Sequence, residues 1–180
     1  MLVKLLMTAF VAVIPTLSEA CMVTLPPAFE DILQADVVVA GTVLDYKIVD
    51  AGTIGELEDY ARFTIQITEI YEGEVSEGQL SFTWANSSFG GPDAFPKSKA
   101  FIFALRDATA APLPLRGLSG TLVPAPDSES LTVLQAPCAD AFIFEQAGPV
   151  ARAVEMIFDG KGDQRIETLI LSEYLGMTRE

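Results

Sequence analysis

The chain has 180 residues, 50% of them hydrophobic and 20% charged, so it can build one domain with a real core and is too apolar to be disordered. Its 25 acidic and 11 basic residues give a net charge of −14, which argues against nucleic acid and an anionic membrane surface as partners. The absence of histidine excludes the Ser-His-Asp triad, the Cys-His pair and every histidine-ligated metal site. We therefore expect a non-catalytic binding or structural module with no metal and no cofactor.

The first twenty residues have the pattern of a secretory signal peptide. Lys4 is a basic start, residues 5–14 are an apolar run, and Ser18-Glu19-Ala20 is a small-x-small cleavage site. The run is shorter than the roughly 20 residues that cross a bilayer, and no later segment is long and apolar enough to do so. We expect cleavage after Ala20 and a secreted or periplasmic chain that begins at Cys21. An uncleaved anchor and acylation of Cys21 are the alternatives.

Export changes the meaning of the two cysteines. In an oxidising compartment an even number of cysteines favours a disulfide, and Cys21 and Cys138 allow one pairing. This bond would tie the mature N-terminus to a point near the end of the core. Two free buried thiols are the alternative.

The middle of the chain is dominated by strand patterns that follow a short helix at Phe29–Leu33. Gly41, inside a valine-rich run, indicates a bend or a close backbone approach. The alternation of apolar residues slips after Thr68, which indicates a bulge. Residues 86–99 have the composition of a loop, and the continuously apolar run at 100–105 predicts a strand buried on both faces. The expected strands are 35–49, 60–71, 80–84 and 100–105, with a hairpin formed by 121–123 and 131–134.

The end of the chain changes to a helical period. Pro149 opens a helix with one apolar face that ends at Gly160, and Asp163 caps a second helix with an apolar stripe from Ile166 to Tyr174. The chain is therefore expected to be mainly β, a small antiparallel barrel or sandwich with a C-terminal pair of short α-helices. We divide it into a signal peptide (1–20), a barrel domain (21–145) and a helical extension packed on the barrel (146–180).

The order of these landmarks resembles the netrin-like module, and specifically the N-terminal domain of the tissue inhibitors of metalloproteinases. The shared features are a cysteine that opens the mature chain, a strand of the type Ala-Asp-Val-Val-x-x-Gly-x-Val, a strand that ends in a Tyr-Glu-Gly turn, an apolar strand and a cysteine just after the last strand. Here they are Cys21, residues 35–43, residues 63–73, residues 100–105 and Cys138. The resemblance covers residues 21–145 and implies an OB-fold, a five-stranded Greek-key barrel.

The resemblance also implies a mechanism and a protein partner, a metalloprotease. In the family, the free α-amino group and carbonyl of the first cysteine chelate the catalytic zinc of the protease. The partner-facing edge would then be Cys21, Met22 and Val23 together with Ser87 and Ser88. The chain departs from the family because it lacks the additional cysteines that the family places two residues after the first and in the loop after the third strand.

Two other functions stay open at this point. An envelope module that binds a small ligand or a glycan would use a barrel mouth. Tyr60, Trp84 and Phe89 are the candidate ligand-stacking residues of such a module. The alternating pattern of the strands favours core packing for these side chains instead. A hydrolase that uses carboxylates alone would need two of them about 5–10 Å apart in a cleft.

Overall fold

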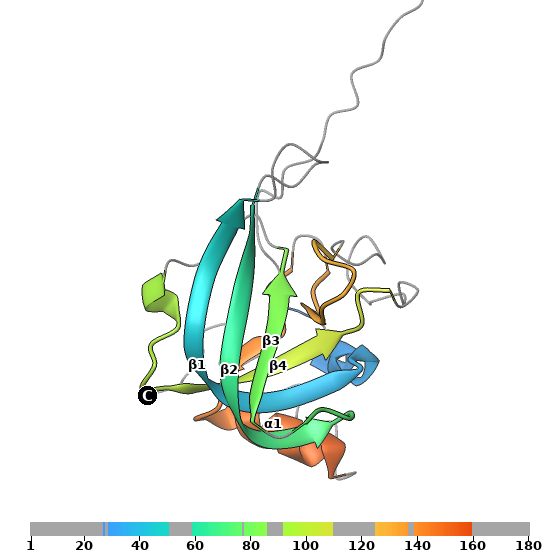
Figure 1. The fold of residues 1–180 in the computed structure, drawn as a ribbon. Helices are drawn as coiled ribbons and strands as arrows, with labels where there is room; N and C mark the ends of the chain where they lie inside the picture. The colour runs from blue at the N-terminus through green and yellow to red at the C-terminus, as the bar shows by residue number, and fades with distance from the viewer. Residues whose placement is uncertain are drawn as a thin grey trace, which may run out of the picture.

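The computed structural model describes residues 27, 29–50, 59–76, 78–85, 92–109, 125–136 and 139–159. Within these ranges the chain forms six strands, two 3₁₀ helices and one α-helix (Figure 1). In chain order they are η1 (Phe29–Gln34), β1 (Val37–Asp50), β2 (Asp59–Glu72), β3 (Gln79–Trp84), η2 (Pro92–Ala94), β4 (Ala100–Arg106), β5 (Thr132–Val133), β6 (Ile143–Glu145) and α1 (Pro149–Phe158).

The long antiparallel pair of β1 and β2 is shaped by one glycine and by bulges. A Cβ at Gly41 would lie 2.6 Å from the backbone oxygen of Gln66, which confirms the close approach predicted at this position. Gly41 pairs with Ile67 while the preceding residue pairs with Glu69, so Thr68 is an extra residue and the predicted bulge is confirmed. These irregularities let both strands curve around the barrel.

The strands close into a five-stranded barrel in the order β1-β2-β3-β5-β4-β1. All neighbours are antiparallel except β3 and β5, which are parallel and meet at the single pair Thr83 and Thr132. The expectation of a mainly β fold with a small barrel is therefore confirmed. Of the predicted hairpin, residues 132–133 form β5, which pairs with β3 and β4, whereas residues 121–123 lie outside the described ranges.

β5 and β6 are two parts of one interrupted strand. β1 occupies one edge of β4 along residues 100–105, so β5 and β6 must share the other edge. Between them the chain leaves the ladder at Leu134, whose N–H donates to Ala104 O at 2.9 Å, and returns at Phe142, whose carbonyl accepts from Ala104 N at 3.0 Å. We call the described residues of this stretch, 134–136 and 139–142, the excursion. β6 follows Cys138, so the expectation that this cysteine comes after the last strand is wrong.

Side chains pack on both faces of the barrel wall. The inner core fills the barrel, and the outer core lies between β1, β4, the excursion, η1 and α1. β4 supplies both, because Phe103 and Leu105 point inward while Ile102 and Ala104 point outward, which confirms the strand predicted to be buried on both faces. The fully buried side chains of the inner core include Phe63, Ile65 and Phe103, and those of the outer core include Ile32, Val38, Ile102 and Val154.

α1 covers the outer core and is the first of the two predicted C-terminal helices. It begins at Pro149, carries Ala151, Ala153 and Val154 on its buried face, and ends before Asp159, whose N–H donates to Glu155 O at 2.8 Å. It lies at the lower end of the barrel in Figure 1. The described residues thus contain one C-terminal helix rather than a pair, and the second predicted helix lies outside them.

Candidate functional site

The residues proposed from the sequence as the partner-facing edge lie outside the described ranges, and so does the second cysteine. These are Cys21, Met22, Val23, Ser87, Ser88 and Cys138. The structure does describe the segments that lead into them. In the sequence, η1 is the first described element after residues 21–23, Ala85 is the last described residue before Ser87, and Ala136 and Ala139 flank Cys138.

A buried side-chain bridge joins the end of β3 to the excursion. The indole Nε1 of Trp84 donates a hydrogen bond to Gln135 Oε1 at 2.8 Å, and Gln135 Nε2 donates to the Ala139 carbonyl at 2.7 Å. Gln135 is 5% exposed, so both bonds are shielded from water and leaving either unmade would be costly. The amide therefore holds Trp84 and the two limbs of the excursion in one arrangement.

The excursion also packs against η1. Ala136, Ala139 and Phe142 belong to the same outer core as Phe29 and Ile32. The Phe29 ring lies 5.6 Å from that of Phe144 in β6, at a tilted angle. The excursion is thus fixed on one side by the bridge to Trp84 and on the other by apolar contact with η1.

These contacts bring together the described residues that flank the two predicted segments. η1 comes after residues 21–23 in the sequence, and Ala85 comes directly after Trp84 and before Ser87. η1 packs against the excursion, and Trp84 is hydrogen-bonded to it. Gln135 was not predicted from the sequence, although one signal was available: it is the single polar residue between the apolar pairs Val133-Leu134 and Ala136-Pro137.

Trp84 serves the inner core rather than a ligand-stacking face. Its side chain is 7% exposed, and its ring lies 6.2 Å from those of Phe63 and Phe95. Trp84 pairs across the ladder with Ala61, which points inward, so the neighbouring Tyr60 projects from the other face of the sheet. Core packing is confirmed for Trp84, and Phe89 lies outside the described residues.

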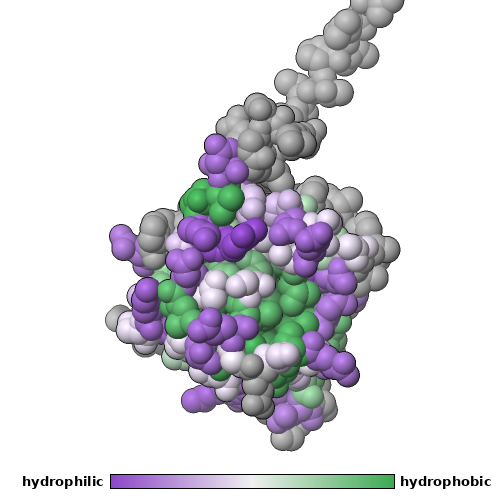
Figure 2. Space-filling model, in the orientation of Figure 1, coloured by the Kyte–Doolittle hydropathy of each residue, from purple (hydrophilic) through white to green (hydrophobic). Residues whose placement is uncertain are grey.

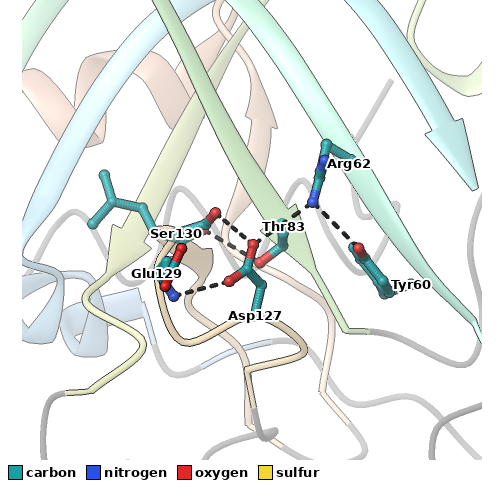
Figure 3. A network of polar contacts seen from close by, with 7 residues as sticks. Tyr60, Arg62, Thr83, Asp127, Glu129 and Ser130 are labelled. Carbon is teal, nitrogen blue, oxygen red and sulfur yellow. Dashed lines mark hydrogen bonds and ion pairs between the residues drawn. The ribbon is translucent and has the colours of Figure 1, made fainter. Parts of the chain in front are cut away.

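A polar network on the outer face of the barrel fixes the turn before β5 (Figure 3). Asp127 accepts hydrogen bonds from the backbone N–H of Glu129 at 2.9 Å and the hydroxyl of Ser130 at 2.8 Å, and its Oδ2 lies 3.6 Å from Nη2 of Arg62. These donors, the backbone N–H first, hold the pKa of Asp127 below its usual value. Arg62 also donates to the Tyr60 hydroxyl at 3.2 Å. The network joins the turn to β2 and has the geometry of a contact that stabilises the fold.

A second polar contact joins the end of β2 to the segment before α1. Glu69 Oε2 accepts from the Tyr71 hydroxyl at 2.9 Å and from Gln146 Nε2 at 3.2 Å. Burial, followed by the hydrogen bond and charge of Glu69, raises the pKa of Tyr71 to about 12. The phenol therefore stays protonated at neutral pH and acts as a donor.

The described ranges contain no group of three or more Asp, Glu, Cys or His residues that could hold a metal ion. They also contain no helix long and apolar enough to cross a membrane. No protein-family model matches the chain, and no curated protein matches it.

Proposed function

We propose that the chain is an exported, non-catalytic binding module with an OB-fold of the netrin-like kind, whose partner is a protein, and that zinc metalloproteases are the first partner class to test. The barrel supports the fold, because it has five strands, and a single parallel neighbour pair closes it. The observation that carries the functional proposal is the convergence of η1, the end of β3 and the excursion.

Chelation of a protease zinc by a chain terminus requires that the terminus is held rigidly, because a flexible one loses affinity to the entropy of ordering. η1 supplies part of this rigidity, since Phe29 and Ile32 are 6% and 0% exposed in the outer core. A disulfide between Cys21 and Cys138 would supply the rest. It would join the N-terminus to an excursion that the Trp84–Gln135 bridge already holds.

The covalent state of the exported chain is tested first. Intact-mass analysis is expected to show a chain that starts at Cys21 without a fatty acid. Thiol labelling of the denatured, unreduced protein is expected to find no free cysteine. A mass that retains residues 1–20 or includes acyl chains contradicts the processing, and two labelled thiols contradict the disulfide.

The inhibitory mechanism is tested by moving the α-amino group. One alanine added before Cys21 displaces the amine from chelating position and leaves the barrel unchanged, so the extended chain is expected to lose inhibition of a zinc protease that the native chain inhibits. A chelating amine must be neutral and its ordinary pKa is about 7.7–8.0, so inhibition is expected to strengthen as pH rises through this range. Equal inhibition by both chains rules out chelation through Cys21.

The glycan-binding alternative has less support. A glycan-binding role for the three aromatic residues is weakened because Trp84 is buried and Tyr60 projects from the opposite face of the sheet. If the native chain inhibits no metalloprotease, including those of its host, the metalloprotease assignment fails and a protein-binding module of another specificity replaces it.

A further inference from the structure

The two limbs of the excursion are bonded to each other. Phe142 N–H donates to Leu134 O at 3.2 Å, and Ala139 N–H donates to Ala136 O at 3.2 Å. The second bond spans three positions, as in a β-turn. We call Ala136 and Ala139 the tip of the excursion. In the sequence Cys138 stands between them, so the described residues on either side of this cysteine are fixed to one another.

The Trp84–Gln135 bridge connects this tip to the inside of the barrel. Trp84 belongs to the inner core and the tip to the outer core, and Gln135 bonds to both, since it accepts from the indole and donates to the Ala139 carbonyl. Figure 2 shows polar side chains around the rim of one face of the molecule, where water competes for their hydrogen bonds. The bridge is enclosed instead, because Trp84 and Gln135 are 7% and 5% exposed. A displacement of the tip therefore has to break a buried bond or move the indole with it.

The N-terminal side of the chain reaches the excursion through η1. Phe29 and Ile32 belong to the same outer core as both limbs of the excursion. In the sequence, seven residues separate Cys21 from Phe29. A disulfide between Cys21 and Cys138 would thus close between two supports that are each held by the barrel. Closing a covalent loop is more favourable when its ends have less freedom to lose, so each support makes the disulfide harder to reduce.

We propose that Gln135 couples the Cys21–Cys138 disulfide to the loop after β3, so that a dithiol reductant that opens the disulfide loosens both parts of the partner-facing edge together. This inference rests on the disulfide and the edge proposed above. The path runs from the carbonyl that follows Cys138 through the amide of Gln135 to the indole of Trp84, three positions before the first serine of the edge. Partner binding at this edge would then respond to the redox state of the two cysteines.

The redox step is a thiol–disulfide exchange. One thiolate of the reductant attacks a sulfur of the disulfide and forms a mixed disulfide, and the second thiolate then displaces the protein sulfur. Cys21 and Cys138 are left as thiols after gaining two electrons and two protons, and the reductant is oxidised to its own disulfide. Because coupling is reciprocal, the bridge favours the disulfide by the same factor as the disulfide favours the bridge.

The first test measures the equilibrium between the full exported chain and dithiothreitol, without denaturant, by trapping free thiols. Gln135→Leu is expected to be reduced at a ratio of reduced to oxidised dithiothreitol about fivefold or more lower than the native chain. Trp84→Phe removes the indole donor and keeps an aromatic ring, and it is expected to change the equilibrium in the same direction. Gly41→Ala is the matched control, since it strains the barrel at Gln66 without touching the bridge, and its equilibrium is expected to equal that of the native chain.

The second test reads the bridge itself. The chain has one tryptophan, so a ¹⁵N-labelled sample gives one indole N–H signal. Reduction of the native chain is expected to shift this signal and to speed its hydrogen exchange by about fivefold or more. The backbone amide of Ala85, at the start of the loop after β3, is expected to shift with it. In Gln135→Leu the indole is expected to exchange fast in both redox states. A residue that only stabilises the fold would not link the indole to the cysteines.

The outcomes separate this inference from the function on which it rests. Equal reduction of the native chain and Gln135→Leu overturns the inference and leaves the proposed function standing, and so does an indole signal that is identical in the oxidised and reduced chains. If Gln135→Leu does not fold, Trp84→Phe decides in its place. Two labelled thiols in the unreduced native chain overturn the disulfide itself, and the inference with it.

Discussion

The Trp84–Gln135 bridge makes a prediction that can be worked from the structure. Gln135→Leu removes the acceptor of the indole N–H and the donor to the Ala139 carbonyl, at a site that is 5% exposed. Each of the two buried groups left unsatisfied costs about 1–3 kcal/mol, and the added apolar side chain returns about 1 kcal/mol or more. We therefore expect the free energy of unfolding to fall by about 1–5 kcal/mol.

Urea unfolding measures this loss, and fluorescence reports the site directly because the chain has one tryptophan. The native emission of Trp84 is expected to change in Gln135→Leu before any unfolding. Gln79→Leu is the matched control, since Gln79 is exposed and its substitution is expected to change stability by less than about 0.5 kcal/mol. A loss below 1 kcal/mol in Gln135→Leu, with unchanged emission, would refute the structural role of the bridge.

Three further predictions concern other parts of the barrel. Gly41→Ala is expected to lower the free energy of unfolding by about 1–3 kcal/mol in urea, because the new Cβ would lie 2.6 Å from Gln66 O; an unchanged midpoint would contradict this. The Tyr71 phenol is expected to titrate near pH 12 by NMR, and Glu69→Gln should lower its pKa by removing the nearby charge. The Asp127 carboxyl is expected to have a pKa below its ordinary value of 3.8. Its contribution to stability is therefore present above pH 3.8 and is lost as the pH falls through the lowered pKa. A pKa at or above 3.8 in a carboxyl ¹³C titration would contradict this.

Local patterns were sufficient to predict much of the barrel. Gly41 and the slip after Thr68 are visible in a few residues, because a missing side chain and a break in alternation act on the nearest neighbouring strand. The double burial of residues 100–105 could be predicted for the same reason, since a strand with no polar face has no side to expose. Each of these features depends on short-range sequence and one adjacent element.

The remaining features depend on contacts between distant segments. β6 is three residues long and has no alternation to detect, and it forms because the excursion returns the chain to the edge of β4. Gln135 is a polar residue in an apolar segment, and its role depends on Trp84, which lies 51 positions earlier. The turn that Asp127 holds before β5 could not be predicted either, because its contact with Arg62 joins distant segments of the chain.

The double burial of β4 has a consequence for where this module can be cut. One face of the strand supports the interior of the barrel, and the other supports α1 through the outer core. A truncation after β6 would keep the six described strands and yet remove Ala151, Ala153 and Val154 from the outer core, to which Ile102, Ala104 and Phe142 also belong. Among the described residues, the unit that covers its own core is therefore the barrel together with α1, and moving this barrel into another protein requires that both are moved together.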